Sequence, residues 1–200
     1  MTPDAADAEA PRTGMISPEG LNSLYATTQD PWDYTTSWYE LRKRQITVAC
    51  LPEERYRRCY EPGCSIGELT KVLAPRCAEL LATDGAATAV QLAREATQGL
   101  GHVRDEHAVL PQELPGGSFD LIVLSELLYF FPDEHLPGLV DVIAGRLASD
   151  GDLVAVHCNA MESCAGAGVH RFLFAHPRLV PLTHHQDEGF ALDVFRRAQG

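Results

Sequence analysis

Lysine is the scarcest charged residue of this chain: only Lys43 and Lys71 occur among its 200 residues. Lysine and arginine together number 16, against 28 aspartates and glutamates, and the formal net charge is −12. The arginines form no long basic tract, and we expect the tightest group, Arg55, Arg57 and Arg58, to be solvated. Because binding to nucleic-acid phosphates needs clustered cations, this charge balance argues against a nucleic-acid partner.

Long hydrophobic runs and paired cysteines are also missing. The longest apolar stretches, 121–124 and 127–131, are interrupted by Ser125 and Glu126 and fall far short of the ~20 residues of a membrane-spanning helix. The N-terminus shows no charged-then-apolar signal pattern. The cysteines, at positions 50, 59, 64, 77, 158 and 164, form no C-x-x-C pair, so we expect no zinc site, redox pair or disulfide. These absences predict a cytoplasmic protein that binds no membrane.

The dinucleotide fingerprint G-x-G-x-x-G is absent, but a related loop is present. The stretch Glu61-Pro62-Gly63-Cys64-Ser65-Ile66-Gly67 joins a strand predicted near 57–62 to a helical pattern over 66–76. Glycines at such a junction let the backbone turn sharply and approach a ligand closely. The spacing acid-x-G-x-S-x-G is nearer to loops that hold S-adenosylmethionine than to those that hold dinucleotides.

Downstream of residue 57, the hydrophobic pattern alternates between the strand period and the helix period. Strands are predicted at 57–62, 79–83, 102–107, 119–124 and 152–158, and helices at 66–76, 86–98, 133–148 and 167–175. Strands separated by helices pair in parallel through right-handed crossovers. Two short runs, 179–183 and 190–195, have no helix between them and predict an antiparallel hairpin with its turn at 184–189. The predicted fold class is therefore α/β, with a doubly wound and mostly parallel sheet.

The N-terminal quarter has a different character. Residues 1–15 carry no apolar period and are predicted to be disordered, whereas residues 16–200 are predicted to form a single domain. Its first part, 16–51, has a helical pattern, and the segment 30–44 is rich in aromatic residues. We interpret 16–51 as a helical lid over a bound cofactor, since aromatic faces suit a sulfonium cation and an arginine suits a carboxylate. The alternative is that the aromatic residues only anchor these helices on the sheet.

Polar side chains follow several strands, where a doubly wound sheet binds its ligands. Asp84 ends the second strand, and its carboxylate can accept both hydroxyls of a ribose; a helix N-cap is the alternative. After the third strand, Asp105 or Glu106 could bind an exocyclic amine of adenine. Ser125 and Glu126 follow a fully apolar strand, so we expect Glu126 at the rim of the cleft.

Histidines are the other candidates for chemistry. His157 ends the fifth strand, and an unperturbed pKa near ~6.5 suits a general base; a structural histidine beneath the site is the alternative. His170 could line the same mouth. His184 and His185 fall in the predicted hairpin turn, and no third ligand stands at a suitable spacing, so no metal site is predicted.

Taken together, these features resemble class I S-adenosylmethionine-dependent methyltransferases, and within them the NodS-type N-methyltransferases. The segments that carry the resemblance are DPWDYTTSWYELRKR, EPGCSIGELT, LLATDGA, FDLIVLSELLYFF and GVHRFLF…FALDVFRR, which span about residues 21–197. The resemblance implies a Rossmann-like, seven-stranded sheet whose last strand is antiparallel. It also implies S-adenosylmethionine as cofactor and S-adenosylhomocysteine as product.

The resemblance further implies which residues bind the cofactor. The loop residues would hold its methionine part, Asp84 its ribose, and Tyr39 and Arg42 would cover it from the lid. The segment 159–168, rich in small residues, belongs to a region that helps to shape the acceptor site in relatives. The predicted cofactor-binding residues are Tyr39, Arg42, Glu61, Gly63, Cys64, Ser65, Gly67, Asp84, Gly85, Glu106 and Ser125.

Methyl transfer to an amine requires an aligned and unprotonated nitrogen, so a group that accepts the amine's proton raises the reactive fraction. Glu126 and His157 are the predicted catalytic residues. We expect N-methylation of an amine on a small molecule such as an amino sugar. The alternatives are an O-methyltransferase, in which His157 would matter more, and a nucleotide-binding module without catalysis. The sequence sets neither the acceptor nor the oligomeric state.

Overall fold

The structure is a computed structural model that describes residues 16–159 and 166–199. The predicted disorder of 1–15 and most of the small-residue segment 159–168 therefore lie outside the described residues. The strands are β1 (Tyr56–Pro62), β2 (Cys77–Asp84), β3 (Val103–His107), β4 (Phe119–Ser125), β5 (Leu147–Cys158), β6 (Leu179–Gln186) and β7 (Phe190–Arg197). The α-helices are α1 (Pro18–Thr27), α2 (Trp38–Ala49), α3 (Glu68–Leu73), α4 (Ala87–Ala96), α5 (Leu136–Gly145) and α6 (Gly166–Phe174), with short 3-10 helices η1 (Ala74–Arg76) and η2 (Leu128–Phe130).

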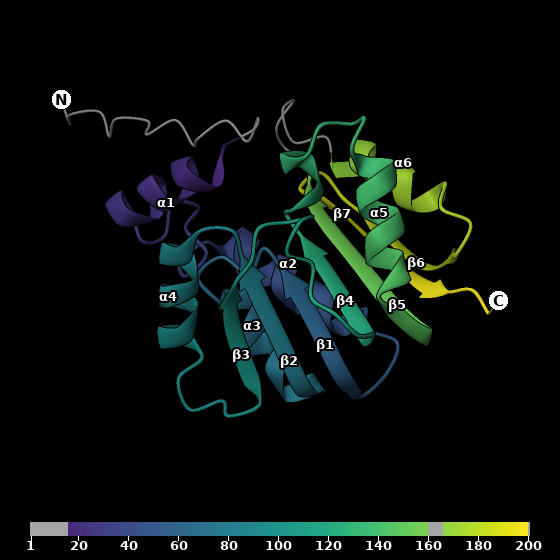
Figure 1. Cartoon of the computed structure of the whole chain (residues 1–200), viewed down its shortest axis with the longest axis horizontal. Coiled ribbons are helices and arrows are strands. Elements are labelled where there is room, and N and C mark those ends of the chain that lie inside the picture. Colours follow the sequence, from purple (N-terminus) through teal and green to yellow (C-terminus); the bar gives the residue numbers. More distant parts are fainter. Residues whose placement is uncertain (1–15, 160–165, 200) are drawn as a thin grey trace.

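All seven strands belong to one sheet with the order β3-β2-β1-β4-β5-β7-β6 (Figure 1). The first five strands pair in parallel, whereas β7 is antiparallel to both β5 and β6. The predicted doubly wound α/β fold with an antiparallel end is thus confirmed. The hairpin turn was predicted too long: β6 continues to Gln186, and His184 and His185 lie in this strand. Their polar side chains on an edge strand give no hydrophobic signal, which hid the strand's last residues.

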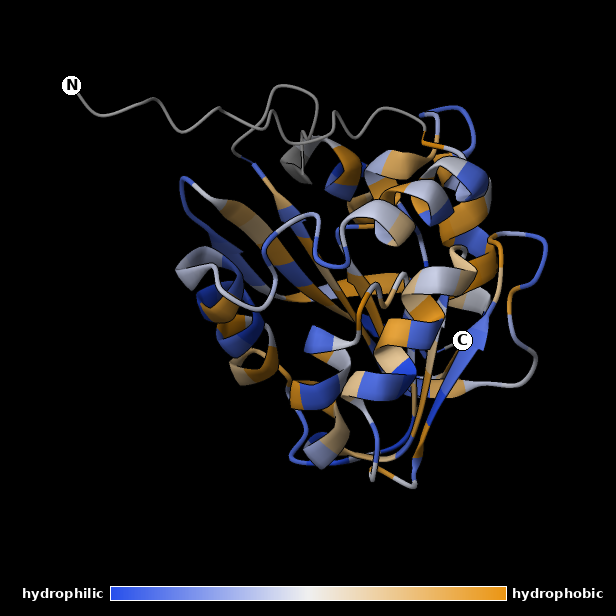
Figure 2. Cartoon of the chain, turned by 90° about the vertical axis from the view of Figure 1, so that its left-hand side faces the viewer, coloured by the Kyte–Doolittle hydropathy of each residue, from blue (hydrophilic) through white to orange (hydrophobic). Residues whose placement is uncertain are grey.

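The strand residues alternate between two apolar layers, as the period of two requires. In β4, Ile122 and Leu124 pack with residues of α5 and α6, whereas Leu121 and Val123 pack on the opposite face with residues of α3. Figure 2 shows apolar segments on both the strands and the helices that cover them. The sheet is therefore covered on both faces, which explains why β4 is apolar almost throughout.

The segment 16–51, predicted to be helical, contains the two helices α1 and α2, and both begin at a serine cap. Ser17 accepts a hydrogen bond from Gly20 N, with Pro18 in the first turn, and Ser37 accepts one from Glu40 N. Helix α2 is unusual because its buried residues are all polar: Glu40, Lys43, Arg44 and Thr47. None of the described helices is both long and apolar enough to cross a membrane.

Strand order reverses between β1 and β4, so the loops that follow them diverge to opposite faces of the sheet. Such a switch point leaves a crevice at the carboxyl ends of the strands, where ligands bind in this architecture. Three segments predicted to bind or react meet there: the glycine loop after β1, Asp84 at the end of β2 and Glu126 after β4.

Candidate functional site

The glycine loop between β1 and α3 is held by its neighbour β2. Gly63 N and Cys64 N both donate to the carbonyl of Thr83, at 2.7 and 2.9 Å, and Ser65 N donates to Asp84 Oδ2 at 2.9 Å. Gly63, Ser65 and Gly67 alternate in the left-handed region, with φ of 75°, 52° and 82°. This alternation folds the loop into a concave turn at the end of the sheet.

Asp84 organises the loop and also faces the site. Its second oxygen, Oδ1, accepts from Ala86 N at 2.8 Å, so the carboxylate forms a local turn instead of capping α4, whose N-cap residue is Ala86. Burial raises the pKa of Asp84, and its two backbone hydrogen bonds partly offset this effect. The carboxylate lines the main cavity, where a ribose was predicted.

The main cavity, of about 780 Å³, lies between the lid and the carboxyl ends of the strands. Among the described residues that line it are five carboxylates and a single cation, Lys43. Seven aromatic side chains complete much of the wall, including Tyr25, Trp32 and Tyr34 from the lid. The acids are Asp30, Asp33, Glu40, Asp84 and Glu126. A cavity lined by carboxylates and by the faces of aromatic rings favours a cationic ligand.

The lid contacts the glycine loop directly. The hydroxyl groups of Tyr25 on α1 and Ser65 are 2.6 Å apart. Tyr25 packs edge-on against Trp32, whose ring lies 5.8 Å from that of Tyr34. The turn between these aromatic residues is fixed by Asp30, whose carboxylate accepts from Tyr34 N at 2.8 Å. An aromatic lid over this end of the sheet was predicted, but Tyr25 and Tyr34 were not singled out.

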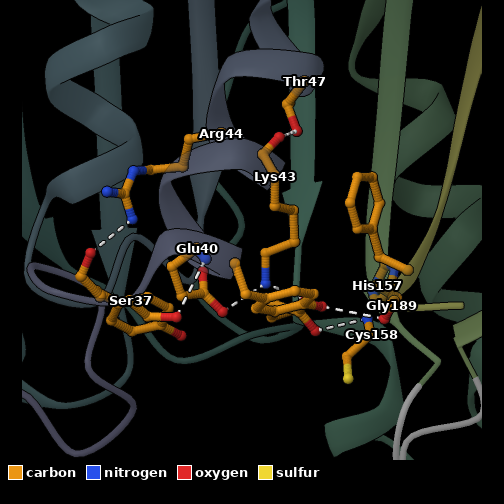
Figure 3. Close-up of polar contacts among 12 residues, drawn as sticks. Ser37, Glu40, Lys43, Arg44, Thr47, His157, Cys158 and Gly189 are labelled. Atoms are coloured by element: carbon orange, nitrogen blue, oxygen red, sulfur yellow. Dashed lines mark hydrogen bonds and ion pairs between the residues drawn. The ribbon is translucent and has the colours of Figure 1, made fainter. Parts of the chain in front are cut away.

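A buried charge cluster joins the lid to β4. Lys43 Nζ lies 2.8 Å from Glu40 Oε1 and 2.5 Å from Glu126 Oε1; Figure 3 shows Lys43 descending from α2 toward Glu40. Burial alone would lower the pKa of Lys43, but the two carboxylates outweigh it and raise that pKa. The other oxygen of Glu126 accepts from Tyr129 Oη and from Cys158 N. Sequence reasoning missed Glu40, Lys43 and Tyr129; the rarity of lysine in this chain was the available signal.

The structure brings most of the predicted site residues together. Glu61 and Cys64 line a small adjoining cavity of about 30 Å³. Glu61 is fully buried and accepts from Thr70 Oγ1 at 2.7 Å, and burial raises its pKa to about 8. Burial also raises the pKa of the Cys64 thiol, which suits a packing position. The predicted residues that line the main cavity are Tyr39, Gly63, Ser65, Asp84, Gly85, Ser125 and Glu126.

Other predicted residues lie away from both cavities. Arg42 pairs with Asp187 at 2.6 Å, in the turn between β6 and β7. Glu106 is exposed on β3, and its carboxylate lies 3.9 Å from the Arg104 guanidinium. Neighbouring residues of a strand point to opposite faces of the sheet, so Asp105 is the buried residue here. Gly67 caps α3, and a Cβ there would lie 3.1 Å from Ala93 Cα.

His157 also lies behind the cavity wall. Its imidazole is fully buried, and Nε2 accepts hydrogen bonds from Leu127 N and Leu128 N at 3.2 and 3.0 Å. Nδ1 lies 2.8 Å from His170 Nε2, so both ring nitrogens are engaged within the fold. Burial, reinforced by His170 and Lys43, lowers the pKa of His157 well below its ordinary value. This placement matches the structural alternative for His157 and not the predicted general base.

The chain is similar in sequence and fold to several known proteins. The sequence model of the Nodulation protein S (NodS) family matches residues 21–171, which is more than half of the chain. The chain belongs to this family. Nodulation protein S of Azorhizobium caulinodans is 27% identical over 144 residues, covering 70% of this chain and 69% of the relative.

Two solved structures are similar to this chain in fold. A Pseudomonas syringae protein assigned as a methyltransferase is 41% identical, with a TM-score of 0.73 over 80% of this chain and 100% of its own. N-methyltransferase NodS from Bradyrhizobium japonicum WM9, in complex with S-adenosylhomocysteine, shares the fold with a TM-score of 0.81. It is 22% identical, and the match covers 92% of this chain and 100% of that one. The predictions of the NodS family, of a methyltransferase fold and of an enzyme of the methyltransferase class are confirmed.

Proposed function

We propose that this NodS-family enzyme transfers a methyl group from S-adenosylmethionine to an amine of a small molecule, such as an amino sugar. The charge of the cavity carries the proposal: among the described lining residues, five carboxylates against one ammonium group favour both a sulfonium donor and an ammonium-bearing acceptor. A hydroxyl acceptor would gain nothing from this charge, and a phosphate-rich ligand such as a dinucleotide would be repelled by it.

The residues present fit S-adenosylmethionine. Gly63 lies in the left-handed region, and a Cβ there would lie 3.1 Å from Leu127 Cδ1, so a larger residue would strain the loop and press on the Leu127 side chain of the cavity wall. Glu61, Ser65 and the loop backbone would hold the methionine part, and Asp84 the ribose. When bound, S-adenosylmethionine supplies an electrophilic methyl group on a sulfonium. The aromatic lid and the closely packed loop would exclude water from that group.

The chain's own contribution to reactivity centres on Glu126. Lys43 Nζ lies 2.5 Å from its Oε1, while Cys158 N and Tyr129 Oη both donate to its Oε2. An acceptor ammonium that binds here in place of the Tyr129 hydroxyl would pass a proton to the Glu126 carboxylate and leave a neutral amine with a free lone pair. Since His157 is buried behind the cavity wall, we assign this proton transfer to Glu126 alone.

Labelled methyl transfer tests the proposal. With S-adenosylmethionine carrying a labelled methyl group, we expect label on glucosamine and on other small amines, but none on N-acetylglucosamine or on simple alcohols. N-acetylglucosamine is the matched control because acetylation turns the basic amine into a non-basic amide and leaves the sugar hydroxyls unchanged. Label on alcohols alone would favour an O-methyltransferase, and no transfer to any acceptor despite tight binding of S-adenosylhomocysteine would favour a module without catalysis.

A further inference from the structure

Behind the cavity wall, three buried side chains form a continuous hydrogen-bonded chain across β5, α6 and β7. His157 Nδ1 lies 2.8 Å from His170 Nε2, and His170 Nδ1 lies 2.5 Å from Asp193 Oδ2. Each of the three residues is at most 1% exposed. The other oxygen of Asp193 contacts His184 Nδ1 at 2.7 Å, at the exposed edge of the sheet. None of the three lines either cavity, so ligand contact does not explain them.

The contacts at the inner end fix where the protons lie. Backbone N–H groups can only donate, so His157 Nε2, which accepts from those of Leu127 and Leu128, is unprotonated in this arrangement. His157 is then neutral and carries its proton on Nδ1, which donates to His170 Nε2. His170 must in turn carry a proton on Nδ1, which donates to the carboxylate of Asp193. One tautomer of each histidine thus gives every polar atom in this series of three side chains a hydrogen-bond partner.

The two amides that His157 accepts belong to the turn that presents the site. Glu126 adopts a left-handed φ of 52°, a conformation that a non-glycine residue keeps only when its surroundings enforce it. Its own amide donates to the carbonyl of Val156, and the next two amides donate to His157. Leu127 faces the other half of the site, with Cδ1 3.1 Å from the position of a Cβ on Gly63.

We propose that Asp193 and His170 are positioning residues that hold His157 in its Nδ1-protonated tautomer, so that His157 anchors the 126–128 turn. This anchor keeps Glu126 at the cavity and Leu127 against the glycine loop. The inference rests on the proposed function only for the role of Glu126 as proton acceptor. The tautomer and the anchored amides are properties of the protein that can be measured without any substrate.

Nitrogen-15 NMR of the histidine side chains tests the tautomer. In the wild-type protein we expect Nε2 of His157 to be unprotonated and Nδ1 protonated from about pH 6 to pH 8. Asp193→Asn should shift both resonances toward a mixture of tautomers. Asp141→Asn is the matched control, since Asp141 faces a different histidine, His176, on the surface. A protonated Nε2 in the wild-type protein overturns the proposal even where the variant fails to fold.

A second experiment separates anchoring from general loss of structure. His157→Phe removes the acceptor, whereas His157→Gln retains a side-chain oxygen at a similar reach. Hydrogen exchange of the Leu127 and Leu128 amides should accelerate in the Phe variant and stay slow in the Gln variant, with Val123 in β4 unchanged in both. The kcat for glucosamine should fall by about 100-fold in the Phe variant, more than KM rises, and recover largely in the Gln variant.

The outcomes of the two proposals are distinguishable. If neither glucosamine nor any other amine is methylated, the proposed function fails. The NMR and exchange results still show whether His157, held by His170 and Asp193, anchors the 126–128 turn. If Leu127 and Leu128 remain protected in His157→Phe, or if His157→Gln loses as much activity as His157→Phe, the anchoring chain is wrong and the proposed function stands.

Discussion

The ammonium of Lys43 lies between two carboxylates from distant parts of the chain, Glu40 on the lid and Glu126 after β4. Only 4% of its side chain is exposed. Lys43→Ala would leave both carboxylates buried without their cation. Because such unpaired burial is strongly destabilising, we expect the free energy of unfolding in urea to fall by about 3–5 kcal/mol.

The chain's only other lysine supplies a control. Lys71 pairs with Glu68 on the exposed side of α3, with 38% of its side chain accessible. Lys71→Ala should therefore change the free energy of unfolding by no more than about 1 kcal/mol. Equal losses in the two variants would mean that the charge cluster does not hold the lid.

Glu61 makes stability depend on pH in a direction opposite to that of most carboxylates. Its pKa is about 8 in the folded chain, against the ordinary 4.5, so the folded state binds the extra proton between these values. Its contribution is then fully present below pH 4.5 and is lost as pH rises through 8. Compared with Glu61→Gln, the wild-type protein should lose roughly 3–5 kcal/mol of unfolding free energy between pH 5 and pH 8.5.

Urea unfolding of both proteins across this pH range measures that difference. Glu61→Gln keeps the shape of the neutral acid and an acceptor for Thr70 Oγ1. All other titrating groups are common to the two proteins, so subtracting the curves isolates Glu61. A difference that does not change with pH would show that Glu61 is ionised in the folded protein at neutrality.

At the scale of elements, the glycine loop depends on the closeness of α4. Gly67 and Gly99 both have left-handed φ values, 82° and 91°, but a Cβ would meet the backbone of Ala93 at 3.1 Å only at Gly67. Gly99→Ala should cost about 1–2 kcal/mol from backbone strain alone. Gly67→Ala should cost a further ~1–3 kcal/mol, because neither helix backbone can move away freely. Thermal unfolding of the two variants measures the difference, and equal losses would contradict it.

Local patterns were sufficient to predict the elements but not all of their faces. The apolar run of β4 and the glycines after β1 mark the sheet and its ligand loop, because burial and tight turns restrict residue type. The fully buried residues of helix α2 are polar, among them Glu40 and Lys43, while its apolar residues are at most partly buried, so the hydrophobic periodicity does not show which face is inside. The same limit applies to His157: its place at the end of β5 is readable, but its partner His170 lies on α6.

At the scale of the whole molecule, the lid is tied to the core at several separated points. Besides the Tyr25–Ser65 contact, Tyr39 Oη donates to the carbonyl of Gly189 at 3.1 Å. Because cavity-lining residues come from both the lid and the core, a bound ligand links the two. We expect S-adenosylhomocysteine to slow hydrogen exchange in α1 by about ten-fold or more, while edge strand β6 exchanges at its usual rate.

Exchange followed by mass spectrometry with and without S-adenosylhomocysteine measures this effect. NAD serves as the control ligand, since a dinucleotide has no proposed place in the acidic cavity. Unchanged exchange in α1, at S-adenosylhomocysteine concentrations that saturate the protein, would mean that the lid does not close on the cofactor.

The polar inner face of α2 affects the order in which contacts form while the chain is being synthesised. A ribosome makes the lid long before it makes Glu126, which stands 83 residues beyond Lys43. Until β4 and its following turn have emerged, Lys43 lacks one of its two carboxylate partners. The ion pair between Lys43 and Glu126, and with it this wall of the main cavity, can therefore form only after Glu126 has been synthesised.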